Sequence, residues 1–191
     1  MEKLHERRFE GSPLIMNHTD IITGIAKQMD LNVYIEFGYA GGENFDEMVK
    51  YCKEAHVVDI EIRSPRKHEN AAYHTMKTDD FSENILPKLG KIDMAFIDAD
   101  HESGQVMRDF DNLFASLDDN GIIFMHDTYP LKFEFTRDIN CSDSYRVPKM
   151  IREKYGDKVE MVTIPISPGL TIIRKVHELD FMKENRKYTN P

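Results

Sequence analysis

The chain has 191 residues, of which 40% are hydrophobic and 31% charged, and its formal net charge is −9. This length suits one domain that buries its own core, and an acidic balance disfavours nucleic acid as the main partner. Two cysteines are too few for a disulfide framework or a zinc site. No apolar run approaches the roughly 20 residues of a membrane helix, and Met1 to Glu10 has no apolar signal core. We therefore expect a cytoplasmic globular protein with no membrane partner.

Strand and helix patterns alternate along the chain. Thr19 is a suitable N-cap for the first helix, whose apolar residues share one face. In chain order, the expected strands are residues 33–37, 56–60, 73–78, 92–97, 121–125, 159–164 and 170–176. The expected helices are residues 19–29, 43–54, 66–73, 81–89, 106–117 and 147–155.

This alternation predicts the fold class. Strands separated by helices favour a parallel sheet with helices on both faces, and the two closing strands form a hairpin with an antiparallel edge. We expect an α/β, Rossmann-like fold with a mostly parallel, seven-stranded sheet. Residues 1–176 would form the single domain, including an N-terminal helix, and residues 177–191 a polar tail. Ligands of such sheets bind at the carboxyl ends of the strands.

A glycine-rich loop follows the first expected strand. Residues 36–42 read Glu-Phe-Gly-Tyr-Ala-Gly-Gly, and small residues there let backbone amides approach a ligand at the start of a helix. Asp59, at the end of the next strand, has the spacing at which a carboxylate binds ribose hydroxyls. A plain chain reversal, a nicotinamide dinucleotide and another nucleoside cofactor all remain open on this loop alone.

Further motifs resemble class I S-adenosylmethionine-dependent methyltransferases. Glu36, Gly38, Ala40 and Gly42 resemble their first motif, with Ala40 in place of a usual glycine. Residues 97–101 (Ile-Asp-Ala-Asp-His) and 120–128 resemble a subgroup that includes macrocin-type sugar O-methyltransferases and cephalosporin-hydroxylase-like proteins. The resemblance covers about residues 30–175. The long N-terminal extension of the macrocin enzymes is missing, so their acceptor pocket cannot be transferred to this chain.

The resemblance implies a set of cofactor contacts. S-adenosylmethionine would bind with its methionine part against Gly38 and Gly42 and its ribose on Asp59. Asp79 or Asp80 would accept a hydrogen bond from the adenine amino group, and Phe81 would lie against the ring. Glu36, Ala40 and Asp98 complete the expected cofactor site. Tyr39 is open between covering the methionine part and packing in the core.

Five ionisable residues gather at the ends of the fourth and fifth expected strands, namely Asp98, Asp100, His101, His126 and Asp127. Clustered carboxylates need a cation or a proton, and Asp98 and Asp127 are placed to share a hard cation such as Mg²⁺. Related metal-dependent O-methyltransferases hold an ion there that orients acceptor hydroxyls. Thr128 falls where some of them use a third ligand, an asparagine.

His101 is the candidate catalytic base, because an imidazole titrates near neutrality and can take the acceptor's hydroxyl proton. In macrocin-type enzymes a histidine at the matching place is the proposed base. Structural alternatives stay open: His101 and His126 as structural histidines, Asp100 as a cap of the following helix, and Asp127 as a turn residue.

We therefore expect an O-methyltransferase that uses S-adenosylmethionine and Mg²⁺ on a small hydroxylated molecule such as a sugar. Residues 128–145 would form part of the acceptor pocket, with Phe133, Phe135, Arg137 and Asp138. The alternatives are a non-catalytic nucleoside-binding module and a hydroxylase- or oxidoreductase-like relative of the same fold. The sequence allows a homo-oligomer.

Overall fold

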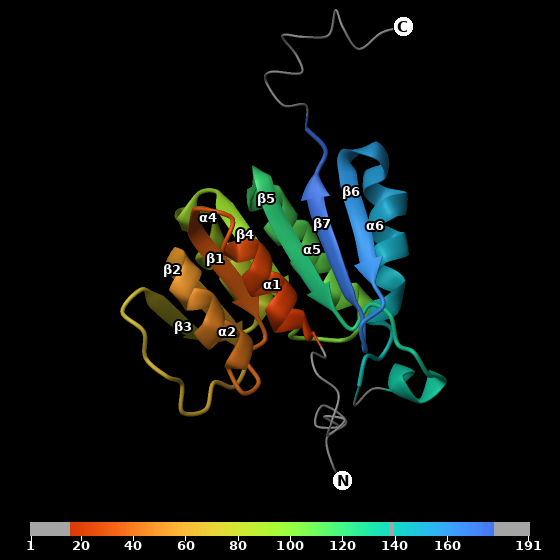
Figure 1. Ribbon diagram of the computed structural model, residues 1–191, viewed down its shortest axis with the longest axis horizontal. Coiled ribbons are helices and arrows are strands. Elements are labelled where there is room, and N and C mark those ends of the chain that lie inside the picture. Colours follow the sequence, from red (N-terminus) through yellow and green to blue (C-terminus); the bar gives the residue numbers. More distant parts are fainter. Residues whose placement is uncertain (1–15, 138–139, 178–191) are drawn as a thin grey trace, which may run out of the picture.

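One mixed sheet forms the centre of the protein. The computed structural model describes residues 16–137 and 140–177, and within them seven strands take the order β3-β2-β1-β4-β5-β7-β6 (Figure 1). Strands β1 to β5 are parallel, and β7 runs antiparallel to both β5 and β6, which confirms the predicted fold class. The strands are β1 (Leu31–Phe37), β2 (Cys52–Asp59), β3 (Ala71–Thr75), β4 (Ile92–Ile97), β5 (Leu117–His126), β6 (Val159–Ile164) and β7 (Leu170–Lys175).

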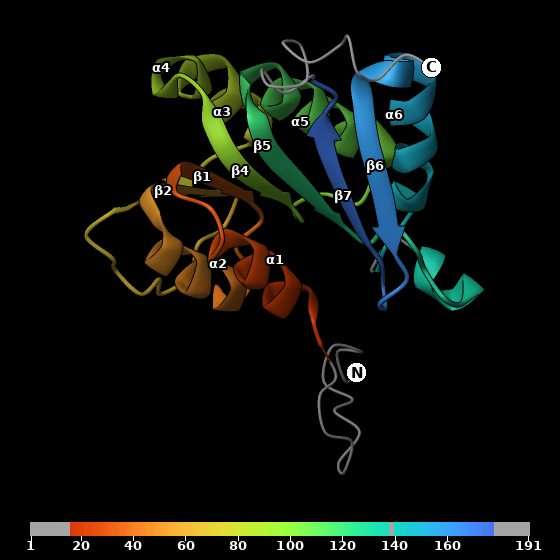
Figure 2. The ribbon, with the colours of Figure 1, turned by 45° about the horizontal axis from the view of Figure 1, so that its top comes forward.

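Helices cover both faces of the sheet, as Figure 2 shows. Helices α1 and α2 pack on one face around Tyr34, Phe45 and Phe96, and α5 and α6 pack on the other around Ile35 and Phe110. The α-helices are α1 (His18–Ala26), α2 (Glu43–Met48), α3 (Thr78–Asn84), α4 (Leu86–Leu89), α5 (Ser103–Ser116) and α6 (Val147–Tyr155). Short 3₁₀ turns are η2 (Val49–Tyr51), η3 (Phe133–Thr136), η4 (Ser144–Arg146) and η5 (Gly156–Lys158). No helix in the described ranges is long and apolar enough to cross a bilayer.

The helix expected at residues 66–73 is wrong. This segment is a loop that leads into β3, where Tyr73 pairs with Val57 of β2. Its polar side chains bond to other elements: His68 contacts Asp46 of α2 at 2.9 Å, and the Asn70 amide donates to the backbone carbonyls of Val49 in η2 and Cys52 in β2. These long-range contacts hold an extended path that local spacing does not reveal.

Several boundaries also differ from the sequence prediction, among them those of α1, α2 and β3, which spans residues 71–75 instead of 73–78. Helix α1 begins at His18 with Asn17 as its N-cap, in a reciprocal capping box with Asp20, so Thr19 is inside the helix. Helix α2 ends at Met48, and the residues that were expected to extend it form η2 and the first part of β2. The expected tail from residue 178 onward lies outside the described residues.

The sheet reverses its strand order between β1 and β4, where the two strand ends come very close together. Gly38 follows β1 with a φ of +97°, and a Cβ added there would lie 2.2 Å from the carbonyl oxygen of Asp98. The backbone N–H of Asp98 in turn donates to the carbonyl of Phe37 at 2.7 Å. Glycine is therefore required for both its backbone conformation and its lack of a side chain.

Gly38→Ala should destabilise the protein more than Gly90→Ala. Gly90 also has a positive φ, of +77°, but a Cβ there meets nothing within 4 Å. The control should therefore cost only the conformational penalty, about 1–3 kcal/mol. Gly38→Ala should cost about 1–3 kcal/mol more, because its methyl group is forced against β4. Denaturant unfolding measures both, and equal losses would contradict the close approach of the two strand ends.

Candidate functional site

Four ionisable side chains meet at the carboxyl ends of β4 and β5. Nε2 of His101 lies 2.9 Å from Oδ2 of Asp127 and 3.8 Å from Oδ1 of Asp98. Nδ1 of His126 lies 3.1 Å from Oδ1 of Asp98 and 3.4 Å from Oδ1 of Asp127. One ligand atom each from Asp98, His101 and Asp127 fits within a 4.8 Å span, which suits a single cation. The structure therefore brings together four of the five residues that the sequence placed at this edge, and Asp100 is not among them.

A segment from β5 to α6 encloses this cluster. Asp127 has a φ of +59°, in the left-handed region that Asp tolerates better than most residues, and its carbonyl accepts a 2.8 Å hydrogen bond from the Ser144 hydroxyl. The Cys141 thiol lies 3.4 Å from Oδ1 of Asp127. Nδ1 of His101 contacts the carbonyl oxygen of Asn140. That contact fixes the ring orientation, so that Nε2 faces the carboxylates.

The four side chains form one electrostatic unit. Burial by itself would raise the pKa of Asp98, but the imidazoles of His126 and His101 hold it well below its usual range. Burial would lower the pKa of His101, yet the carboxylates of Asp127 and Asp98 raise it to about 10. The pKa of His126 is likewise raised by Asp98, despite burial. His101 is therefore protonated at neutral pH when only the carboxylates face it.

The glycine-rich loop lies between β1 and α2, next to Asp59. The backbone N–H of Tyr39 donates to Oδ2 of Asp59 at 2.7 Å, and the N–H of Glu61 donates to Oδ1 at 3.0 Å. Ala40 has a positive φ of +42°, and a Cβ on Gly42 would lie 2.5 Å from the Tyr39 ring. Tyr39 itself is buried among aromatic side chains, which favours its packing interpretation.

Glu36 is buried beneath this loop. Its Oε2 accepts hydrogen bonds from the Tyr34 hydroxyl at 2.5 Å and from the Asn44 amide at 2.7 Å. Burial raises the pKa of Glu36 to about 8, although both hydrogen bonds lower it. Through the bond to Asn44, the carboxyl group links β1 to the first turn of α2 and so supports the glycine-rich loop between them.

Of the three residues expected to contact adenine, two are on the surface and one is in the core. Asp79 and Asp80 are exposed in the first turn of α3, where Gln105 approaches Asp79 at 3.2 Å. Phe81 is 0% exposed and packs edge-on against Phe37 with a centroid distance of 5.8 Å. The expectation that Phe81 lies against the adenine ring is corrected, because this side chain has no exposed surface to offer a ligand.

The structure adds contacts that the sequence analysis missed. His18, the first residue of α1, stacks on Phe96 and meets His126 edge-on, with a ring-centroid distance of 4.4 Å. The hydroxyl of Thr128 accepts a bond from Thr171 of β7 at 2.7 Å, so it is engaged away from the cluster. No pattern in the sequence indicates a role for His18, because its contact with His126 joins the first helix to the fifth strand.

Helix α5 is capped by a residue from another segment. Asp143 accepts a 2.6 Å hydrogen bond from the backbone N–H of Ser103, the first helical residue, and a 2.8 Å bond from its hydroxyl. Asp100 accepts from the N–H of Glu102, which precedes the helix, so it supports the turn after His101. The loop at residues 128–145 exposes Phe133 and half-buries Phe135, and Asp138 lies outside the described residues.

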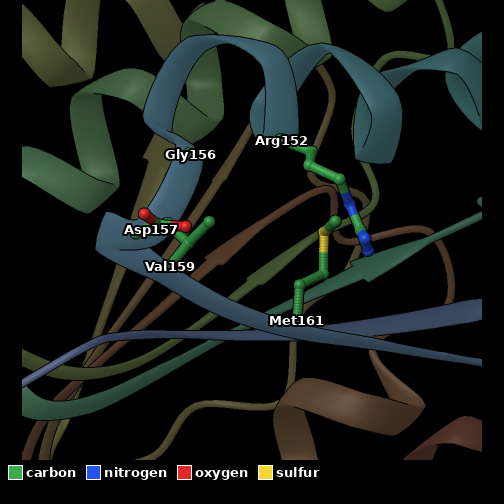
Figure 3. A pocket seen from close by; sticks show the side chains of 5 residues that line it. All are labelled: Arg152, Gly156, Asp157, Val159 and Met161. Atoms are coloured by element: carbon green, nitrogen blue, oxygen red, sulfur yellow. The ribbon is translucent and has the colours of Figure 1, made fainter.

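A cavity of about 300 Å³ lies between the end of α6 and the start of β6, away from the carboxyl ends of the parallel strands (Figure 3). Arg152, Gly156, Asp157, Val159 and Met161 line it. The register of β6 on β7 and of β7 on β5 places Val159 at the amino end of the parallel strands. The cavity is therefore distant from the clustered carboxylates.

Comparisons with known proteins identify the fold. Solved structures with the same fold include an S-adenosylhomocysteine-bound methyltransferase, PaMTH1, from Podospora anserina, at 15% identity, coverage of 83% of this chain and 78% of that one, and a TM-score of 0.61. An rRNA methylase from Streptococcus thermophilus has 10% identity, coverage of 86% and 100%, and a TM-score of 0.64.

A third structure is the methyltransferase MycE of the mycinamycin pathway, in complex with Mg, S-adenosylhomocysteine and mycinamycin VI. It has 16% identity and a TM-score of 0.62, and the match covers 91% of this chain but only half of that one. No curated protein sequence matches the chain.

A family model described as a methyltransferase domain matches residues 29–128, more than half of the chain. The match runs from just before β1 to just after β5 and so includes the glycine-rich loop and the four-residue cluster. The chain belongs to this methyltransferase domain family and is a class I S-adenosylmethionine-dependent methyltransferase.

Proposed function

We propose that the protein transfers the methyl group of S-adenosylmethionine to a hydroxyl of a small molecule, such as a sugar or another polyhydroxylated metabolite, with a divalent cation. The observation that carries this proposal is the cluster of Asp98, His101 and Asp127 at the strand ends next to the glycine-rich loop. The Mg-containing MycE complex, which shares the fold, supports a cation in such an enzyme.

The cofactor would lie across the carboxyl ends of β1 and β2. Gly38, Ala40 and Gly42 present a compact backbone to the methionine part, and the carboxylate of Asp59 faces the ribose. Asp59 already accepts two backbone hydrogen bonds, and a carboxylate has capacity for more. Asp79 or Asp80 would accept from the adenine amino group, since both are exposed at the start of α3. Glu36 would support the loop from the core.

Asp98 and Asp127 fit a hard cation. Each offers a carboxylate on a neighbouring strand end, and their oxygens lie within the span of one ion. When bound, a divalent cation would lower the pKa of an acceptor hydroxyl and fix its orientation. The nearby nitrogen of His101 is in place either to accept a proton or to be a third ligand.

His101 would act as the base. The acceptor oxygen attacks the methyl carbon, the carbon–sulfur bond breaks with its electrons moving to sulfur, and the hydroxyl proton passes to Nε2 of His101. With only the carboxylates present, the pKa of this imidazole is about 10, and the ring is already protonated at neutral pH. A divalent cation on Asp98 and Asp127 offsets their negative charge, which lowers the pKa of His101 and lets it accept a proton.

Asp59→Ala should weaken the binding of S-adenosylhomocysteine by about 1.5–3 kcal/mol, the range for a hydrogen bond to a charged group. The control is Glu61→Ala, two residues further on, whose side chain is exposed and pairs with Arg63 at 2.7 Å. Isothermal titration calorimetry gives both affinities, with thermal unfolding to verify the fold. An unchanged affinity for Asp59→Ala with a loss in Glu61→Ala would move the ribose contact to Glu61.

Asp98→Asn should abolish binding of Mn²⁺, used as a probe for the divalent cation, whereas Asp100→Asn should retain it. The two substitutions remove the same charge two positions apart, but only Asp98 belongs to the cluster. Once an acceptor is found, a chelator should stop turnover and Mg²⁺ should restore it. Full turnover in chelator would rule out the cation.

His101→Ala should lower kcat by a factor of about 10²–10⁴, the usual contribution of a positioned base, and leave S-adenosylhomocysteine binding intact. Mn²⁺ affinity separates the two roles that the geometry allows. A base leaves that affinity nearly unchanged on substitution, whereas a third ligand weakens it strongly. Unchanged kcat and unchanged Mn²⁺ affinity together would make His101 a structural residue.

A further inference from the structure

His126 contacts both carboxylates of the cluster. Its Nδ1 makes a 3.1 Å hydrogen bond with Oδ1 of Asp98 and a longer ionic contact of 3.4 Å with Oδ1 of Asp127. His101 instead meets Oδ2 of Asp127. The two imidazoles thus engage different oxygens of Asp127.

Burial makes this arrangement a fixed one. The side chain of His126 is 4% exposed, so Nδ1 is shielded from water and the carboxylates are its partners. The residue is the last of β5, where its backbone pairs with Leu170 of β7. An imidazole in this setting cannot reach a substrate in solvent without leaving the strand, which argues against a direct catalytic role.

Helix α1 holds the ring of His126 from the other side. The His18 ring lies edge-on to it at 4.4 Å and stacks on Phe96 at 5.5 Å with an interplanar angle of 19°. Phe96 belongs to β4, two residues before Asp98, and its ring lies 6.0 Å from that of His126. In Figure 1 the first turn of α1 lies beside the tip of β5. Three rings from α1, β4 and β5 therefore pack together behind the carboxylates.

We propose that His126 is a positioning residue of the active site: its Nδ1–H holds the Oδ1 atoms of Asp98 and Asp127 together, and His18 keeps its ring in place. Two carboxylates on adjacent strands would otherwise repel each other and turn apart. A donor between them keeps them converged and leaves Oδ2 of Asp127 to His101. This inference rests on the proposed function, since it assigns how that same site is preorganised.

Mn²⁺ affinity of the full-length protein tests the role of His126. His126→Leu removes the N–H at similar volume and should weaken Mn²⁺ binding about 10–100-fold, the usual effect of losing a group that orients metal ligands. His126→Asn places an amide N–H near the same point and should restore most of that affinity. The control is His56→Leu, because His56 is also a buried imidazole on a strand but pairs with His74 instead. It should lose stability without a change in Mn²⁺ affinity.

His18 is tested with the same measurement. His18→Ala should weaken Mn²⁺ binding severalfold, and His18→Phe, which keeps an aromatic ring against Phe96, should not. Equal affinity in the wild type, His126→Leu and His126→Asn would overturn the positioning role while the cation proposal stands.

An NMR measurement decides the question without a metal, and it also covers a His126→Leu variant that does not fold. In protein labelled with ¹⁵N-histidine, the Nδ1–H proton of His126 should exchange slowly and resonate downfield. It is assigned by its disappearance in His126→Asn. The signal should shift in both Asp98→Asn and Asp127→Asn, because Nδ1 contacts both carboxylates. If the wild type binds no Mn²⁺, the cation part of the proposed function fails, and this signal still supports positioning. Its absence, or its insensitivity to both substitutions, would overturn the inference.

Discussion

The structure of the site depends on keeping two carboxylates close together at neighbouring strand ends. Parallel strands β4 and β5 bring Asp98 and Asp127 to the same edge of the sheet, where their negative charges repel each other. The imidazoles of His101 and His126 offset that repulsion. They lower the pKa of Asp98, and the carboxylates raise the pKa of both imidazoles. The surrounding segments serve this arrangement. The chain after β5 supports Asp127 through Ser144 and orients His101 through Asn140, and α1 packs against His126.

The glycine-rich loop shows how one residue type can answer two demands. By resemblance, Gly38 and Gly42 would be cofactor-binding positions, yet the structure gives each a reason within the protein itself. A side chain on Gly38 would meet the backbone of Asp98, and one on Gly42 would meet the ring of Tyr39. The close approach of β1 to β4 therefore brings the loop next to the cluster. The methyl donor and the acceptor would meet at that point. The packing that excludes a side chain there also leaves the backbone uncovered.

The sequence predicted the elements whose causes are local. Apolar runs identified all seven strands, and strand alternation placed Asp98, His101 and Asp127 at one edge. Features that depend on distant residues were missed or misread. The supposed helix at residues 66–73 is held extended by bonds to α2 and β2, and the burial of Phe81 depends on its packing in the core. The contact of His18 with His126 has no sequence signature, because packing alone creates it.

The protonation state of His101 and the binding of a cation by Asp98 and Asp127 depend on each other. His101 carries a proton in the described arrangement because Asp127 and Asp98 surround it with negative charge, and its pKa of about 10 expresses that attraction. A base that is already protonated accepts nothing, so a methyl transfer that uses His101 requires the carboxylates to be neutralised by another positive charge. A divalent cation held by Asp98 and Asp127 would supply that charge, and its binding would release a proton from the cluster. In the proposed mechanism, binding of the cation and loss of the proton from His101 are therefore coupled. The fold contributes by holding the two carboxylates where either the cation or the protonated imidazole can neutralise them.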